Sequence, residues 1–344
     1  MPNRAFYYNN VSGFVFVFCF TVLLLINFSA CRRKPSYDVN IAHIEMDPVE
    51  VKRYEKALFT IDPYNLREEI DPYIDDFYLF LGDEINTPAG QQQLFDYITD
   101  PFIREIWEDV AEIWPSTDLL RNQLNQAFRY FRYHFPEKNT PEVYTYVSGL
   151  DFEHPVFYQD NIVVIALDMF LGRDYDNYNK VGVPVFKRIR FSPVAAPIEV
   201  MREIGHNIML QSPFMPETLL DFMIFEGKVL YFLDSMFPAG IDSLKIYYST
   251  DHINWAQNNE GHSWSYLINN ELLYQTDRQM IQKFTGDAPF TAPFSTRSAP
   301  RMGVYIGWQI VRDFMSRNDE VSLQELLFEK NDSREILQGA RYRP

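Results

Sequence analysis

Apolar residues along this chain recur mainly at the spacing of an α-helix. Asp47 can cap a helix and Pro48 suits its first turn, and the apolar residues Val51, Tyr54 and Leu58 follow at intervals of three and four. We expect helices to dominate from there to about residue 135. Further helix starts are indicated at four places: Asp71-Pro72, Thr87-Pro88, Asp100-Pro101 and Ser116-Thr117-Asp118.

The pattern changes to that of β-strands between residues 141 and 171. Residues 143–147 alternate, and after a turn region residues 161–167 form a run rich in Val and Ile. Two or three strands are expected here, and helices return from about Ser192 to the end of the chain. The sequence therefore predicts a mainly helical α+β fold with a small β-sheet embedded mid-chain. We see no clear boundary within residues 45–340 and expect one domain over residues 45–344.

Aromatic residues are concentrated at the end of one predicted helix, in residues 128–133. Such a stripe could bind sugar rings or a peptide. Aromatic residues at helical spacing more often pack one helix against another, and this is the role we expect.

The first residues of the chain have the pattern of a bacterial lipoprotein signal. An apolar run over residues 11–28 is followed by the small residues Ser29 and Ala30 and then by Cys31. We expect residues 1–30 to be a removable signal peptide, Cys31 to carry a diacylglycerol lipid, and residues 31–44 to be a tether. The alternative is a single membrane-spanning signal anchor, since the run has about the minimum length for one. The only other cysteine, Cys19, lies in the removable part, so the mature chain cannot form a disulfide framework.

The net charge of the chain argues against some classes of binding partner. The whole chain has a net charge of −16, and removing residues 1–30 takes away one positive charge, Arg4, which leaves −17. Such an acidic chain is poorly suited to binding nucleic acid or an anionic lipid surface. Attachment to a membrane would therefore depend on the lipid.

A candidate site lies on the helix predicted after Ser192. Its sequence contains Arg202, Glu203 and His206, and a second apolar helix carries Glu226, twenty residues after the histidine. The arrangement resembles the zinc peptidases of the gluzincin type. In their H-E-x-x-H motif two histidines one helical turn apart bind zinc, the intervening glutamate activates water, and a later glutamate is the third ligand. A strand expected just before the helix, and a helix opening after residues 298–301, extend the likeness.

Arg202 replaces the first histidine of that motif. A dication about 4 Å from a guanidinium would be repelled by roughly 8 kcal/mol at an effective dielectric constant near 20, and arginine cannot lose its proton to become a ligand. We therefore expect a degenerate site with no catalytic residue, no metal and no cofactor other than the lipid. Arg202 would pair with Glu226 or Glu203, with His206 hydrogen-bonded beneath them. If Arg202 swings aside, His252 or His262 could take its place, which would give a zinc peptidase with altered ligands.

The chain also resembles a family over nearly its whole mature length. The motifs that carry this resemblance, besides the cysteine and the Glu203/His206 helix, are Leu167–Gly172 with Tyr175 and Tyr178, Glu226-Gly227, Leu272–Asp277, and Ala299–Arg301 with Gly307-Trp308. With these motifs the chain is similar to the gliding-motility lipoproteins GldB of the Bacteroidetes. The resemblance implies a cell-envelope lipoprotein needed for gliding and linked to type 9 secretion, with no established catalytic activity. It implies other gliding-motility or secretion proteins of the envelope as partners.

Three hypotheses for function follow. The first is a non-catalytic scaffold or binding component built on an inactive, peptidase-like fold. The second is a zinc-dependent metallopeptidase with altered ligands, and the third is a lipid-anchored glycan- or solute-binding protein, which the high aromatic content favours. Surface-exposed lipoproteins of the phylum tend to have acidic residues after the cysteine, whereas this chain has Arg32, Arg33 and Lys34. The expected location is the outer membrane, facing the periplasm.

Overall fold

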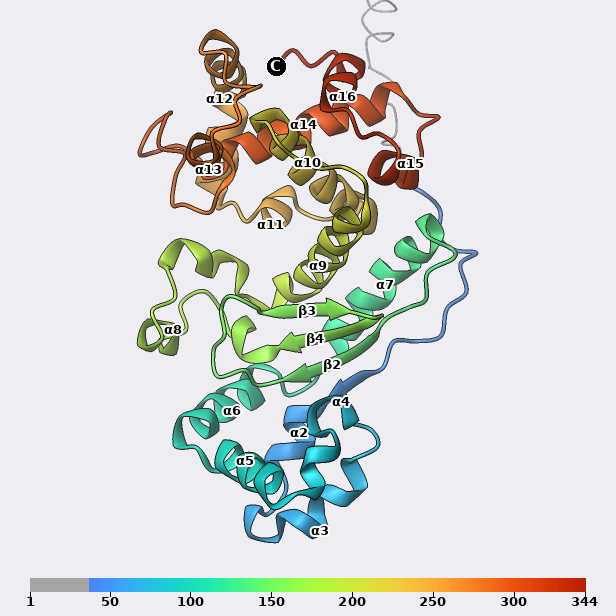
Figure 1. Ribbon diagram of the computed structural model, residues 1–344, viewed down its shortest axis with the longest axis vertical. Coiled ribbons are helices and arrows are strands. Elements are labelled where there is room, and N and C mark those ends of the chain that lie inside the picture. Colours follow the sequence, from blue (N-terminus) through green and yellow to red (C-terminus); the bar gives the residue numbers. More distant parts are fainter. Residues whose placement is uncertain (1–36) are drawn as a thin grey trace, which may run out of the picture. The chain divides into compact units, whose positions relative to one another are not determined.

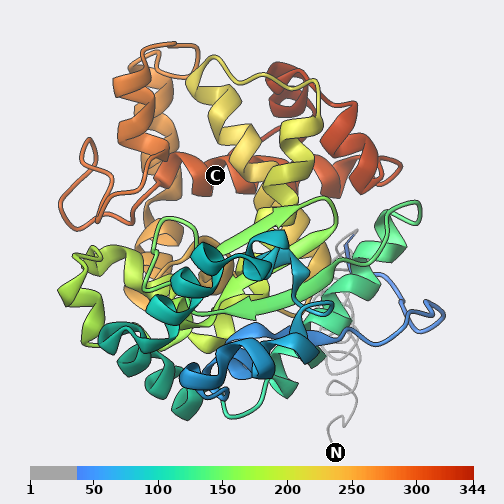
Figure 2. The same cartoon turned by 60° about the horizontal axis from the view of Figure 1, so that its bottom comes forward.

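A small mixed β-sheet lies between two groups of helices in the computed structural model (Figures 1 and 2). The structure describes residues 37–344, which form one compact unit. The expectations for the signal peptide, Cys31 and the first part of the tether lie outside the described residues. No helix of residues 37–344 is long and apolar enough to cross a membrane.

The sheet has four strands in the order β1-β2-β4-β3. Three of them run parallel and the edge strand β3 runs antiparallel to β4, with Val143 of β2 opposite Val163 of β4. The strands are β1 (Val51–Arg53), β2 (Glu142–Tyr146), β3 (Val156–Gln159) and β4 (Ile162–Ala166). The expected strands are confirmed, and the expected turn region contains the additional strand β3. Asp160 and Asn161, both with positive φ, form the two-residue turn between β3 and β4.

The prediction of a helix from residue 47 is wrong at its start. Residues 51–53 form β1, which pairs with β2 through Val51 and Val143, and helix α2 (Tyr54–Phe59) begins only afterwards. Pairing with β2 supplies backbone hydrogen bonds that a local pattern cannot reveal.

Most of the N-terminal helices gather on the β1–β2 side of the sheet (Figures 1 and 2), whereas the last of them, α7 (Asp118–His134), packs against α9 (Ala196–Gln211) and α10 (Leu219–Met236). The predicted starts at Thr87 and Asp100 are confirmed: each side chain accepts hydrogen bonds from the backbone of the following first turn. The start near Asp118 is confirmed as well, whereas Asp71-Pro72 opens only a 3₁₀ turn. The helices are α3 (Leu66–Ile70), α4 (Tyr78–Leu81), α5 (Pro88–Thr99), α6 (Pro101–Ile113) and α7 (Asp118–His134).

The aromatic stripe at the end of α7 packs helices together, as expected. Phe128 and Phe131 are buried, and the ring of Phe131 meets that of Phe232 on helix α10 edge-on at 6.2 Å.

The later helices lie on the β3 side of the sheet (Figures 1 and 2). They are α8 (Asn177–Lys180), α9 (Ala196–Gln211), α10 (Leu219–Met236), α11 (Asp242–Ile246), α12 (Thr250–Asn269), α13 (Arg278–Thr285), α14 (Met302–Arg317), α15 (Leu323–Phe328) and α16 (Ser333–Ala340). The mainly helical α+β fold with a small sheet is thus confirmed. The strand expected just before the α9 helix is wrong, because α8 and three 3₁₀ helices separate β4 from α9. Strand β3 instead packs against α9.

Helices α10 and α14 make the closest helix contact of this group. A Cβ atom on Gly307 of α14 would lie 1.9 Å from the carbonyl oxygen of Met223 on α10, and one on Gly227 would lie 2.5 Å from the carbonyl oxygen of Gly307. Glycine at both positions therefore allows the two backbones to touch. This contact fixes the position of Glu226, which precedes Gly227 on α10.

Candidate functional site

Helix α9 supplies four polar residues within two turns: Glu199, Arg202, Glu203 and His206. Residues three and four positions apart lie on one face of a helix. Here that face is turned toward other protein segments, since Glu199 and Arg202 are both buried. We refer to these four residues, together with Glu226, Arg301, Tyr247, Asp287 and Arg190, as the polar centre.

Arg202 is bound by the segment that ends helix α11. Its guanidinium donates hydrogen bonds to the hydroxyl of Tyr247 and the carbonyl of Lys245, and it lies 4.2 Å from the centre of the Tyr247 ring. Its Nε is also 3.6 Å from a carboxylate oxygen of Glu199. Tyr247 has a left-handed backbone, with φ at +61°, which places its side chain beside the guanidinium. Burial lowers the pKa of Arg202 to about 10, so the side chain is still charged at pH 7.

Glu226 is bound by a different arginine. Its Oε2 accepts a hydrogen bond of 2.9 Å from Nη2 of Arg301, at the start of α14, and lies 3.8 Å from Nε2 of His206. The expected ion pair of Arg202 with Glu226 or Glu203 is therefore wrong. Arg202 extends toward α11 and Glu199, and Arg301, to which the sequence analysis gave no role, takes the carboxylate of Glu226.

Asp287 and Arg190 extend the polar centre. Arg190 donates a 2.8 Å hydrogen bond to Asp287, whose other oxygen is 3.9 Å from Nε of Arg301. The Arg190 guanidinium also lies 5.2 Å from the centre of the Tyr247 ring, so two arginines contact that ring. The positive charges of three arginines are thus distributed among acidic side chains from several segments.

The protein surroundings shift the pKa values of His206, Glu226 and Glu203. Burial lowers the pKa of His206, which favours the neutral imidazole. Burial alone would raise the pKa of Glu226, but His206, Arg301 and Arg202 together hold it below its usual value. Glu203 differs, because burial and the neighbouring Glu199 raise its pKa. Glu203 has no ion pair within residues 37–344.

Two polar atoms of this centre are buried without a hydrogen-bond partner among residues 37–344: Nε2 of His206 and Oε2 of Glu199. The former is the nitrogen that would bind a metal in the peptidase arrangement. The other side chains do not complete such a site, since Glu226 is bound to Arg301 and Arg202 has no lone pair to give. Within the described chain no group of three or more His, Cys, Asp or Glu residues could hold a metal ion. His252 faces the ring of Tyr248, 5.9 Å ring to ring.

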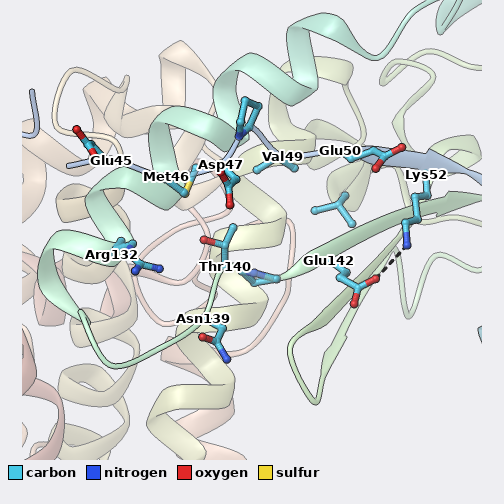
Figure 3. Close-up of a pocket in the computed structure, with 13 residues that line it drawn as sticks. Glu45, Met46, Asp47, Val49, Glu50, Lys52, Arg132, Asn139, Thr140 and Glu142 are labelled. Carbon is cyan, nitrogen blue, oxygen red and sulfur yellow. Dashed lines mark hydrogen bonds and ion pairs between the residues drawn. The ribbon is translucent and has the colours of Figure 1, made fainter.

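A pocket lined by none of the residues of the polar centre is shown in Figure 3. It has a volume of about 710 Å³ and lies between residues 45–52, the end of α7 and the start of β2. Its lining is strongly charged, and Lys52 of β1 and Glu142 of β2, which lie beside each other at one end of the pocket, form an ion pair of 3.1 Å. The sequence analysis did not find this pocket, because its walls come from segments far apart in the chain.

The fold and the polar centre define a mainly helical α+β protein with a charged cluster enclosed by α9, α10, α11 and the start of α14. The chain belongs to the family described as gliding motility protein GldB, whose family model matches residues 34–344. The family predicted from the sequence is thereby confirmed. No curated protein and no solved structure matches the chain.

Proposed function

We propose that this protein is a lipid-anchored component of the cell envelope that is required for gliding and acts by binding a partner, without catalysis. The observation that carries the proposal is the family match over residues 34–344, nearly all of the chain that would remain after removal of a signal peptide. The link to type 9 secretion is part of the same proposal.

The contacts within the polar centre support a role without catalysis. A general base must reach a reacting group, and a catalytic zinc needs three protein ligands and an open position. Arg202 occupies one ligand position and is bound to Tyr247 and Lys245, while Glu226 is bound to Arg301. Glu203 stands in the position of the general base, but no group of three metal-binding side chains lies beside it within residues 37–344. We infer that the polar centre is an inactive remnant of a gluzincin-like site that now ties four helical segments together.

The proposed location is the outer membrane, facing the periplasm. It rests on the sequence around Cys31, where an apolar run precedes the cysteine and three basic residues follow it. The proposed partners are other envelope proteins of the gliding or secretion machinery. An affinity purification of the detergent-solubilised protein from its own envelope would identify them.

A genetic experiment separates a scaffold from a catalyst. We expect deletion of the gene to abolish colony spreading and cell gliding, and a copy encoding Glu203→Gln to restore both fully. The substitution keeps the size of the side chain and removes only its ability to accept a proton. Immunoblotting of the envelope fraction controls for the amount of each variant.

A folded Glu203→Gln variant as defective as the deletion would contradict the scaffold proposal. Zinc bound at one ion per chain in the purified protein would do the same, and would favour the peptidase with altered ligands.

A further inference from the structure

A second pocket, of about 520 Å³, lies on the opposite side of the sheet from the polar centre. Its walls come from α2, α4, α5, the 3₁₀ turn Asp83–Asn86, and residues 146–148 at the end of β2. The pocket therefore lies at the carboxyl end of parallel strands, where open α/β sheets commonly bind ligands. Its volume is within the range of small-molecule sites.

Two glycines shape one wall of this pocket. Gly82 has φ at +53° and ψ at −168°, a conformation that is essentially restricted to glycine. Gly90 lies so close to the preceding 3₁₀ turn that a Cβ atom there would be 2.0 Å from the carbonyl oxygen of Glu84. Any other amino acid at position 82 or 90 would force this wall to rearrange.

Aromatic rings form much of the lining. Tyr54 and Phe80 are stacked with their centres 4.3 Å apart, and Tyr146 lies 6.0 Å from Phe80 at a tilt of 35°. Tyr97 is fixed by a hydrogen bond from its hydroxyl to the carbonyl of Val147. Phe80, Tyr97 and Tyr146 are only partly buried, so they offer apolar surface to a ligand.

The pocket also contains hydroxyl groups without partners. Tyr54 is only 7% exposed, yet its hydroxyl has no hydrogen-bond partner within residues 37–344, and neither has that of Tyr146. Burial raises the pKa of both, that of Tyr146 to about 12, so both hydroxyls remain able to donate. Neither hydroxyl is fully enclosed by protein, so each is open to pair with a ligand that offers a donor or an acceptor.

The charge of the lining restricts the ligand further. Glu84 is its one charged residue, and no cationic side chain lines the pocket. A carboxylate, sulfate or phosphate would therefore meet repulsion and no counter-charge. A plain alkyl chain would cover the tyrosine hydroxyls, Gln93 and Glu84 without hydrogen-bonding to them, which is unfavourable.

We propose that this pocket binds one sugar ring of a neutral saccharide. A sugar ring presents a face of C–H groups, which packs on the partly exposed rings, and carries hydroxyls around its edge. These hydroxyls can pair with Tyr54 and Tyr146, and can donate to the carboxylate of Glu84. This binding activity is additional to the proposed motility role and does not depend on it.

The test is saturation-transfer NMR on the full-length protein in detergent. The probes are glucose, N-acetylglucosamine, maltotriose and N,N′,N″-triacetylchitotriose, with choline and decanoate as cationic and apolar comparisons. We expect a saccharide to bind and the Tyr54→Phe variant, which loses one hydroxyl and keeps its ring, to bind it roughly 3- to 10-fold more weakly. Tyr64→Phe is the matched control, because Tyr64 is 86% exposed and lies outside the pocket, and it should bind as the unmodified protein does.

Three results would overturn the proposal. The first is no transfer to any of the four saccharides, and the second is saccharide binding that Tyr54→Phe leaves unchanged. The third is transfer only to choline or decanoate, which would assign the pocket to a cation or to an alkyl chain.

Discussion

Two arginines of the polar centre each form an ion pair with a different carboxylate. Arg202 lies beside Glu199 on its own helix, whereas Arg301 binds Glu226 on another. Both pairs are largely shielded from solvent, with side-chain exposures between 7% and 18%. Removing one member of such a pair leaves a poorly solvated charge, which is more costly than losing the pair altogether.

The separate pairing predicts which substitutions compensate each other. Arg301→Met should lower the free energy of unfolding by about 3 kcal/mol, because it leaves Glu226 without its partner. Adding Glu226→Leu should restore much of that loss. Arg202→Met should also destabilise, but Glu226→Leu should not rescue it, because the two residues are not bonded. Denaturant unfolding of these four variants and of Glu226→Leu alone gives the two coupling energies. Rescue of Arg202→Met and not of Arg301→Met would reverse the assignment.

The burial of Lys228 predicts how the folding stability depends on pH. This lysine of α10 is completely buried, donates a hydrogen bond to the carbonyl of Lys330 and lies 4.7 Å from the centre of the Phe214 ring. Burial lowers its pKa to about 7 from the ordinary 10.5. Between these two values the unfolded chain holds a proton that the folded protein has released, so folding stability should rise with pH from 7 to 10.5, by about 1.4 kcal/mol per unit from this group.

The measurement is the difference in unfolding free energy between the unmodified protein and Lys228→Met across this pH range. The advantage of the variant should be greatest at or below pH 7 and should shrink as pH rises. Lys245→Met is the control, since Lys245 is equally buried but pairs with Asp234 at 2.8 Å, and its loss should destabilise. A difference for Lys228→Met that does not change with pH would show that the lysine stays charged when folded.

At the scale of helices and strands, local signals identified several elements correctly. Thr87 and Asp100 cap the helices that follow them, and the Val- and Ile-rich run became β4. Strand β1 was missed because three residues with helical spacing became a strand only through pairing with β2, some ninety residues away. The motif on α9 and α10 likewise predicted that residues of these two helices lie close together. It could not show that the partner of Glu226 would be Arg301, which follows it by 75 residues.

The crossing of α10 and α14 predicts a strong position effect for glycine. Gly307→Ala should destabilise the protein by about 3 kcal/mol or more, because the new methyl group would meet the backbone of Met223 and neither helix can yield locally. Gly261→Ala in the middle of α12 is the matched control, since its nearest neighbour is the last residue of the chain, 3.3 Å away. At position 261 the higher helix propensity of alanine, about 1 kcal/mol, should offset the energetic cost of the close contact with the last residue. Equal thermal stability of the two variants would mean that the α10–α14 backbones are not in contact.

At the scale of the whole molecule, the helices that line the proposed saccharide pocket and the helices that carry the polar centre lie on opposite sides of the sheet (Figures 1 and 2). A ligand in the pocket would therefore not contact the polar centre. Both would act on a chain whose mature part carries a net charge of −17 by sequence, which repels it from anionic lipid. The proposed residence at a membrane would then depend on the proposed lipid.

The last prediction concerns that lipid, and it follows from the apolar run and the small residues before Cys31. Each buried methylene of an acyl chain contributes about 0.8 kcal/mol, and stable anchoring takes more than one chain, which a diacylglycerol cysteine provides. Radiolabelled palmitate should therefore be incorporated into the unmodified protein and be absent from Cys31→Ala. Cys19→Ala is the matched control, since it removes the other cysteine and should leave labelling unchanged. Mass spectrometry of the purified protein should find the chain beginning at a lipidated Cys31. Label that persists in Cys31→Ala, or a mature chain that retains residues 1–30, would replace the lipoprotein assignment with a membrane-spanning signal anchor.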